Sequence, residues 1–319
     1  MVRVKEQENE QSSLDLAARA GWLSFVGGLT QDQIANELGI SRQRAQRLVA
    51  RASTEGLIRV RIDHKIADCL ELERGLKAKF DLKSAWVSPG IGEDLDPLTG
   101  LAPFAATIIE NLFLTEESHS YAVGTGRTLR MMVKHMQPLE GAHHKLVSLI
   151  GNVAPDASAT LYEAIMRLAE KTSAKYYPMA VPVIAHTPEE RELYHSLPHV
   201  KVTRKLAEAC DVAIVGIGQM GNNAPLFVDG FITRQELESL QIAGATGEIC
   251  GQVFDQKGRY LDHPFNLRVV GTRVPVNDMP IYCMGAGPSK LPALRAALIG
   301  GLLTGLITDE HTARKLLID

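Results

Sequence analysis

The sequence predicts an α/β protein in two parts: a small winged helix-turn-helix unit at the N-terminus and a larger α/β domain after it. Its 319 residues exceed the size of one ordinary domain. Near the N-terminus, two short helical patterns flank a glycine turn and precede an alternating strand. From residue 83 onward, short apolar strands alternate with helical patterns. We therefore expect a first domain over residues 1–62, a linker helix over 63–82 and a second domain over 83–319.

Composition narrows the class of protein. Hydrophobic residues make up 45% of the chain and charged residues 22%, a balance that excludes a disordered or low-complexity protein. The formal net charge of −3 gives no chain-wide basic field, so any binding to nucleic acid needs a local patch. The longest apolar run, residues 296–307, is shorter than the about 20 residues that a membrane helix needs. Residues 1–11 contain no apolar signal core, so we expect a cytoplasmic protein.

Cysteine and histidine spacing gives no sign of metal or redox chemistry. The four cysteines stand far apart, and no pair forms a CxxC motif. The histidines are scattered and form no metal-binding motif. We predict no metal site, no cofactor and no disulfide framework.

The first helix is expected to begin at a serine cap, Ser12 or Ser13, and to run to about Val26. Two glycines follow and end it. Apolar residues recur in it at helical spacing. These residues are Leu14, Ala17, Ala18, Trp22 and Phe25.

Two further helices and a strand complete the predicted unit. Thr30 and Gln33 have the spacing of a capping box at the start of a short helix, which Gly39 ends. Ser41 caps the next helix, which ends at Gly56. Residues 57–62 then alternate apolar side chains with arginines, as a half-exposed strand does. The inward face of the last helix is formed by Ala45, Leu48, Val49 and Ala52.

Positive charge gathers on this unit. Residues 41–62 contain six arginines and one acid, Glu55. In a helix-turn-helix, the outer face of the second helix reaches base edges in the major groove, where Arg pairs with guanine and Gln with adenine. We expect base contacts from Arg42, Gln43, Arg44, Gln46 and Arg47, and phosphate contacts from Arg59 and Arg61. A small helical domain with a solvated basic face and a helix-turn-helix used for protein contacts are the alternatives.

Residues 63–80 have the pattern of a charged amphipathic helix. Such a helix could pair two chains, because a helix-turn-helix protein commonly reads two half-sites as a dimer. It could equally pack on its own domain. The pattern does not separate these two alternatives.

The larger domain is predicted to hold a mostly parallel sheet with helices on both faces. Ligands on such sheets bind beyond the carboxyl ends of the strands. Helices are expected over residues 161–173 and 291–303, among others. The strand candidates are residues 84–88, 120–123, 145–150, 180–184, 212–217, 266–270 and 281–284.

Three glycine-bearing turns follow predicted strands. In Gly124-Thr125-Gly126-Arg127-Thr128, converging backbone N–H groups, a helix N-terminus, hydroxyls and a guanidinium together form an anion cradle, although a plain tight turn would have a similar sequence. Residues 216–221 are similar to a dinucleotide fingerprint, but two asparagines and a proline stand where its helix should begin, which disfavours nucleotide binding. Residues 285–290 bring Lys290 to a helix start, where it either reaches a ligand or is solvated.

Several segments, in order along nearly the whole chain, carry a family resemblance. They include residues 29–35, 38–41, 124–129, 211–218 and 247–251, and above all Gly287-Pro288-Ser289-Lys290 and Thr308-Asp309-Glu310-His311-Thr312-Ala313. On these segments the chain resembles the SorC family of bacterial sugar-responsive transcriptional regulators, sometimes grouped with DeoR.

The resemblance implies a fold, partners and site residues. The family's effector domain is similar to sugar-phosphate isomerases and deaminases, and its members pair as dimers that form tetramers. The resemblance therefore implies operator DNA, a sugar, polyol or sugar-phosphate effector, and further copies of the chain as partners. By position, Gly124 to Thr128 would hold the phosphate, and Glu248 and Lys290 would line the sugar pocket. The family usually has Asp where this chain has Glu248, which leaves the hydroxyl pattern of the ligand open.

The related enzymes suggest an alternative, a sugar-phosphate isomerase or deaminase fused to a helix-turn-helix. Those enzymes need a general acid and base near the loop that corresponds to residues 216–225. Residues 218–225 here contain no ionisable side chain, so we expect a regulator and not an enzyme. A large domain that serves only oligomerisation is the other alternative. Asp229 and Asn152 follow turn or strand ends and are further candidates for the pocket.

Overall fold

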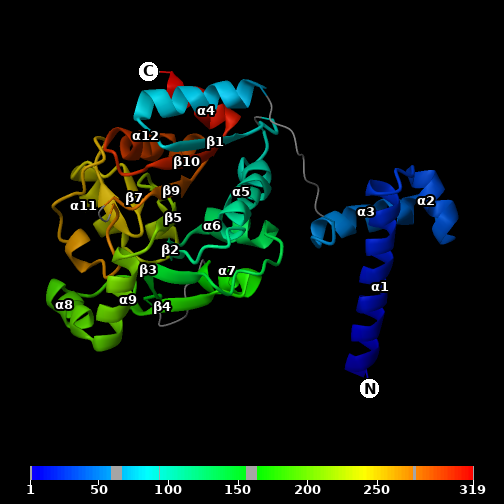
Figure 1. Ribbon diagram of the computed structural model, residues 1–319, viewed down its shortest axis with the longest axis horizontal. Helices are drawn as coiled ribbons and strands as arrows, with labels where there is room; N and C mark the ends of the chain where they lie inside the picture. The colour runs from blue at the N-terminus through cyan, green and yellow to red at the C-terminus, as the bar shows by residue number, and fades with distance from the viewer. Residues whose placement is uncertain (1, 59–66, 93, 156–163, 276–277, 319) are drawn as a thin grey trace. The chain divides into compact units, whose positions relative to one another are not determined.

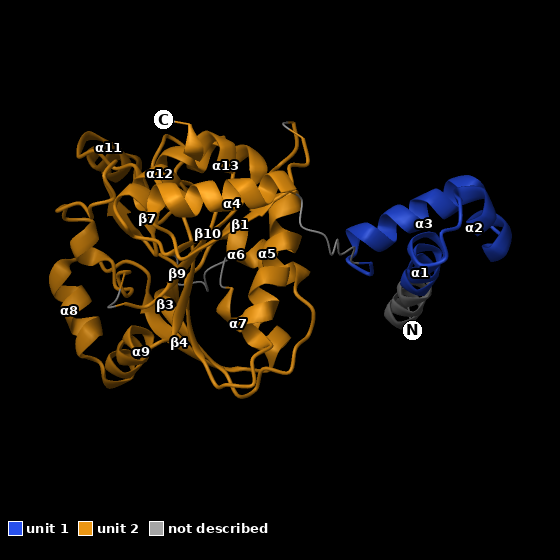
Figure 2. Ribbon diagram, turned by 45° about the horizontal axis from the view of Figure 1, so that its top comes forward, with its two compact units in different colours: residues 1–64 blue, residues 65–319 orange. Residues whose placement is uncertain are grey.

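The computed structural model describes residues 2–58, 67–92, 94–155, 164–275 and 278–318, with side chains from residue 13 onward. The chain divides into two compact units, residues 1–64 and 65–319 (Figure 2). The predicted three-part division at residues 62 and 82 stays a prediction.

Unit 1 is a three-helix unit with a helix-turn-helix. Gly39, at φ 63°, adopts the left-handed conformation that joins its last two helices. The small core contains Ile34 together with the predicted inward face of the third helix. The helices are α1 (Val2–Phe25), α2 (Gln31–Leu38) and α3 (Arg42–Thr54).

Two predictions for unit 1 need correction. Helix α1 begins well before Ser12, and three residues of its predicted inward stripe face solvent: Ala18, Trp22 with 65% and Phe25 with 50% of their surface exposed. Ala17 is buried as predicted, and the other buried positions are Ala20 and Gly21, which the pattern did not single out; all three are small because α1 lies close against its neighbours. A Cβ on Gly21 would lie 2.1 Å from Cδ1 of Ile58. Most of the predicted strand, with Arg59 and Arg61, lies outside the described residues.

Unit 2 is built on a seven-stranded sheet whose neighbouring strands are all parallel (Figure 1). Three predicted strands, 84–88, 120–123 and 281–284, have the bounds that the structure shows. In spatial order the strands are β1 (Ser84–Ser88), β10 (Gly305–Asp309), β9 (Ile281–Met284), β5 (Val212–Gly216), β2 (Ser120–Val123), β3 (Lys145–Val153) and β4 (Lys175–Pro182).

Helices cover both faces of this sheet, as the alternation predicted. Side chains of one strand alternate between the two resulting cores: Tyr121 and Val123 enter one, and Ala122 enters the other. The first core is covered by α5 (Leu98–Phe113), α6 (Arg127–His135) and α7 (Ile165–Thr172). The second is covered by α4 (Ala67–Phe80), α9 (Pro198–Glu208), α12 (Leu291–Ile299) and α13 (Glu310–Leu317), while α8 (Pro188–Ser196) packs beside α9.

A smaller antiparallel sheet adjoins the carboxyl end of β5. It has its own apolar cluster and was not predicted from the sequence. Its elements are β6 (Gly218–Gln219), β7 (Gly247–Ile249), β8 (Gln252–Phe254), α10 (Pro225–Val228) and α11 (Arg234–Ile242).

The predicted strand 266–270 is wrong. Asn266–Arg268 is a short 3-10 helix, and the buried Asn266 amide bonds to β8 in place of a strand. Its Oδ1 accepts from the Val253 N–H at 2.8 Å, and its Nδ2 donates to the Val253 carbonyl at 2.8 Å. A side-chain amide here copies the hydrogen bonds of a backbone partner, which an apolar pattern alone does not reveal.

Helix α4 packs on its own unit, against β1 and α13. The Lys79 ammonium donates to the Leu317 carbonyl at 3.1 Å, and Arg314 lies 3.5 Å from Asp68. These contacts agree with the second of the two alternatives for this segment. Within the described ranges, no helix is long and apolar enough to cross a membrane.

Candidate functional site

The helix-turn-helix is held by two side-chain caps. The Thr30 hydroxyl accepts from the Gln33 N–H at 3.4 Å, and the Gln33 side chain accepts from the Thr30 N–H at 2.8 Å, which confirms the predicted capping box. The Ser41 hydroxyl accepts from the Arg44 N–H at 3.3 Å at the start of α3. Each cap is worth about 1 kcal/mol, so the start of α3 is fixed by local chemistry.

Helix α3 presents one apolar and one polar face. The apolar face is buried against α1 and α2, as predicted. Arg42 lies 3.5 Å from Asp32, and both side chains are largely exposed, so this ion pair does little to hold the arginine. The five residues predicted to contact base edges, Arg42, Gln43, Arg44, Gln46 and Arg47, are all exposed.

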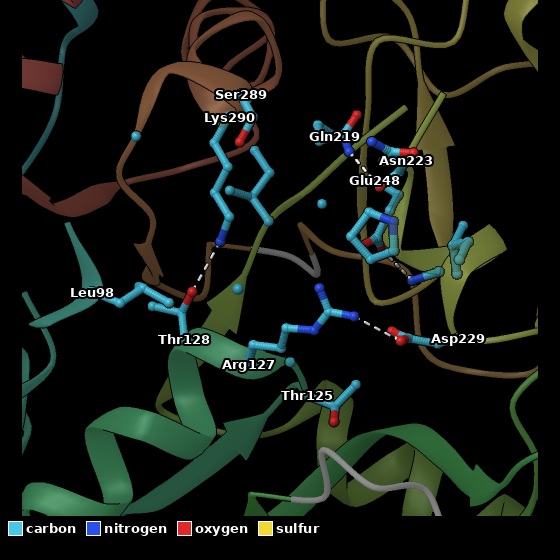
Figure 3. A pocket seen from close by; sticks show the side chains of 18 of the residues that line it. Leu98, Thr125, Arg127, Thr128, Gln219, Asn223, Asp229, Glu248, Ser289 and Lys290 are labelled. Carbon is cyan, nitrogen blue, oxygen red and sulfur yellow. Dashed lines mark hydrogen bonds and ion pairs between the residues drawn. The ribbon is translucent and has the colours of Figure 1, made fainter. Parts of the chain in front are cut away.

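Unit 2 contains a cavity of about 530 Å³ beyond the carboxyl ends of β2, β5 and β9 (Figure 3). From β2 the chain proceeds to β3 and β4 on one side of the sheet, and from β5 it proceeds to β9 and β10 on the other. The boundary between β2 and β5 is therefore the topological switch point, where α/β sheets form their binding crevice. Six of the predicted effector residues belong to this cavity: Thr125, Gly126, Arg127, Thr128, Glu248 and Lys290.

The turn after β2 forms one wall of the cavity. Gly126 has φ 130° and ψ 165°, a conformation open to glycine, and directly precedes α6. The N–H groups at the start of α6 thus border the cavity at the positive end of the helix dipole. Gly124 is buried behind this wall, where a Cβ would lie 3.1 Å from the Sγ of Cys250.

Lys290 and Thr128 meet across the cavity although they are far apart in sequence. The Lys290 ammonium donates to the Thr128 hydroxyl at 2.9 Å. Burial lowers the pKa of Lys290 below its usual 10.5, against the opposing effects of Cys283 and Glu248. The lysine is therefore drawn into the cavity and is not the solvated surface lysine of the alternative interpretation.

Glu248 lies on strand β7, not in a surface loop. Its Oε2 accepts from the Gly251 N–H at 2.8 Å in the hairpin turn between β7 and β8. Gly218 is its cross-strand neighbour, and a Cβ there would lie 2.1 Å from its Oε1, so a glycine makes room for the carboxylate. Burial raises the pKa of Glu248 above 4.5, although the Gly251 N–H and Lys290 lower it.

The sequence offered Asp229 and Asn152 as further candidates for the pocket. Asp229 lines the cavity, whereas Asn152 is not among its lining residues. One oxygen of Asp229 lies 2.8 Å from a terminal nitrogen of Arg127. Asp96, just before α5, also lines the cavity, and no sequence signal indicated it. The segment before α5, which contains Asp96, comes to the cavity only because of the tertiary fold.

The glycine turn after β5 does not continue into a long helix. It forms β6 and then the short helix α10, so the arrangement of a dinucleotide site is absent from these described residues. Gln219 and Asn223 line the cavity from this stretch, and neither titrates. The cavity can therefore donate and accept hydrogen bonds and hold charge, but this wall offers no general acid or base.

Comparisons with known proteins agree with this geometry. A family model described as "Putative sugar-binding domain" matches residues 64–318, and a model of the MarR family matches residues 20–64. The structure is similar to the full-length sorbitol operon regulator SorC from Klebsiella pneumoniae, with a TM-score of 0.70 and 24% identity, covering 96% of this chain and 99% of that one. The erythritol catabolism regulatory protein EryD of Brucella abortus is 35% identical over 303 residues, 95% of this chain and 96% of EryD. The chain belongs to the SorC family of sugar-binding transcriptional regulators.

Membership in the SorC family decides between regulator and enzyme. The transcriptional regulator LsrR of Klebsiella pneumoniae is also similar, at 30% identity over 98% of this chain and 97% of LsrR. These relatives are regulators, so this SorC-family chain is a DNA-binding transcriptional regulator with a sugar-binding domain and not an enzyme.

Proposed function

We propose that a small sugar or polyol, free or phosphorylated, binds in the cavity of unit 2 and thereby changes the affinity of α3 for an operator. One observation supports this most directly. Arg127, Thr128, Glu248 and Lys290 come from three distant segments, yet all face one cavity at the switch point of the sheet. A volume of about 530 Å³ is within the usual range for a small-molecule site.

The two ends of the cavity suit different parts of such a ligand. Backbone N–H groups near Gly124, Thr125 and Gly126, the hydroxyl of Thr128 and the Arg127 guanidinium would hold a phosphate or the end of a polyol. Glu248 would accept hydrogen bonds from hydroxyl groups, and Lys290 would donate to them. The name of EryD refers to erythritol catabolism, so a four-carbon polyol and its phosphate are the first compounds to test.

Operator contacts follow from the exposed face of α3. Arg42, Gln43, Arg44, Gln46 and Arg47 would read base edges, and Arg59 and Arg61 would neutralise phosphates. We expect the regulator to act in the cytoplasm as a dimer or tetramer, since a helix-turn-helix usually reads two half-sites.

A hydrogen bond and the packing of two helices link the loop that presents Lys290 to the start of unit 2. The N–H of Gly287, in the loop that presents Lys290, donates to the Thr312 hydroxyl at 2.9 Å. Thr312 lies in the first turn of α13, whose N-cap is Asp309, and α13 packs on α4. Helix α4 directly follows the segment that joins the two units, so a shift of this loop would be felt where unit 2 begins.

Thermal unfolding with a ligand panel tests the proposal. The panel contains erythritol, sorbitol, deoxyribose and their phosphates. A ligand at 100 times its Kd should stabilise the chain by about 2.7 kcal/mol. The same ligand should change operator affinity, measured by fluorescence anisotropy with a labelled duplex. If no compound shifts the unfolding temperature, the proposal is wrong, and the result favours the alternative in which unit 2 serves oligomerisation only.

A further inference from the structure

We propose that Asp229 sets the selectivity of the cavity between neutral and phosphorylated effectors, because it competes with an anionic ligand group for the Arg127 guanidinium. This inference rests on the proposed function. The ligand property that Asp229 distinguishes is negative charge.

The Arg127–Asp229 ion pair spans two separate parts of unit 2. Arg127 is the first residue of α6, and Asp229 ends α10, beside the small sheet. The two side chains meet at 2.8 Å within the cavity, where the dashed line in Figure 3 marks the pair. Asp229 has 17% of its side chain exposed and Arg127 48%, so the carboxylate is the more buried partner. An anionic ligand group that binds the Arg127 guanidinium must therefore compete with the Asp229 carboxylate for it.

The position of Asp229 is fixed by its backbone. Its N–H donates to the Pro225 carbonyl at 2.9 Å, and the next N–H, of Gly230, donates to Phe227 at 3.0 Å. Gly230 has φ 76°, which places a tight turn directly after the aspartate. The carboxylate thus approaches Arg127 from a rigid element, whereas the guanidinium stands on a long side chain that can turn toward a ligand.

The charges that face the cavity make this competition selective. Its described lining contains three carboxylates, Asp96, Asp229 and Glu248, and two cations, Arg127 and Lys290. A dianionic phosphate entering beside the intact pair adds to an excess of negative charge. A neutral polyol adds no charge, and the lining offers it both hydrogen-bond donors and hydrogen-bond acceptors. Because like charges brought together in a desolvated site are strongly unfavourable, the cavity with Asp229 charged prefers the neutral ligand.

Replacing the carboxylate by its neutral isostere separates these effects. We expect Asp229→Asn to strengthen binding of erythritol 4-phosphate and of inorganic phosphate about tenfold or more, and to change binding of erythritol less than threefold. In an Arg127→Ala background the gain should shrink, since the competition is for Arg127. Isothermal titration calorimetry on the full chain measures all three ligands.

The chain offers a matched control. Asp255 also lies 2.8 Å from an arginine, Arg259, and has 15% of its side chain exposed, but it does not line the cavity. Asp255→Asn removes the same charge from the chain, so it should leave the ratio of the two affinities unchanged. Asp229→Ser is a second variant of smaller size, and it should shift the ratio in the same direction as Asp229→Asn.

Each outcome is decisive. If wild type binds erythritol or its phosphate but Asp229→Asn leaves the ratio of affinities unchanged, the selectivity role is wrong and the proposed function stands. Equal weakening of both ligands by both Asp229 variants shows a merely structural role. If wild type and variants bind no compound of the panel, the proposed function is wrong and the selectivity role with it.

Discussion

The exposed polar face of α3, formed by residues 42–44, 46 and 47, and the cavity of unit 2 are built in opposite ways. All the proposed base-contacting residues of α3 come from one stretch, Arg42 to Arg47, and are exposed. The cavity draws charged groups from segments as far apart as Asp96 and Lys290, and it buries or half-buries most of them. A contiguous exposed face follows from helical periodicity and two caps, whereas the cavity requires the whole sheet.

This difference predicts how each site responds to mutation. Changes on the face of α3 should act locally and leave the rest of the chain untouched. Changes in the cavity should act on several partners at once, because its groups share hydrogen bonds and charge in a site of low dielectric.

The largest effect should come from a charge in the core under α3. Ala45 is fully buried, so Ala45→Asp would bury a carboxylate without a partner and destabilise unit 1 by at least about 3 kcal/mol. Operator binding should be lost while effector binding by unit 2 persists. Calorimetry and anisotropy on the full chain measure both. Ala18→Asp, at an exposed position of α1, is the control. Loss of effector binding in Ala45→Asp would show that the two sites are not built independently.

Removal of one reading side chain should weaken operator binding alone. If Arg44 contacts a guanine, Arg44→Ala should cost about 1–3 kcal/mol of operator affinity and relax specificity at one base pair. Anisotropy with a set of operator variants measures both. Arg74→Ala removes the same charge from an exposed position of α4 and should have little effect. Unchanged affinity and specificity in Arg44→Ala would exclude Arg44 as a base-contacting residue.

A near-isosteric change in the cavity should affect a phosphorylated effector. Thr128→Val removes the hydroxyl that accepts from the Lys290 ammonium, so a half-buried lysine loses a partner and a phosphate loses a donor. We expect about tenfold weaker binding, roughly 1.4 kcal/mol, with operator affinity of the ligand-free protein unchanged. Calorimetric titration with the phosphorylated and the neutral compound checks this. Equal affinity for wild type and variant would indicate an unphosphorylated effector.

The smallest effect should be a pH dependence of effector binding. Because burial raises the pKa of Glu248, its carboxylate takes up a proton at higher pH than an exposed glutamate does. A neutral polyol that binds this carboxylate should lose affinity, by about twofold to fivefold, as the pH falls, and this loss should set in above the ordinary glutamate pKa of 4.5. Glu248→Gln should remove this acid limb, and a variant profile that matches wild type would exclude Glu248 as the titrating group. The lowered pKa of Lys290 gives the opposite, alkaline limb below pH 10.5.

Prediction from sequence succeeded where the signals are local. The capping box at Thr30, the Ser41 cap and the inward face of α3 follow from spacing within a few residues, and the structure confirms them. Strand β10 was missed because it shares an apolar run with the end of α12, and a buried helix and a buried strand have similar patterns there. Strands β7 and β8 have three residues each, too few for a periodic signal.

The sequence by itself determined the two-part architecture, the parallel sheet with helices on both faces, and most of the predicted segments that line the cavity. These features rest on periodicity, caps and glycine turns, which act over a few neighbouring residues. Only the tertiary structure decided that Asp229 pairs with Arg127, that Asp96 reaches the cavity, and that Glu248 stands against Gly218 on a strand. Such contacts join segments that approach one another only when the sheet and its crossover connections assemble. The spacing of residues along the chain does not predict which of these distant segments come into contact.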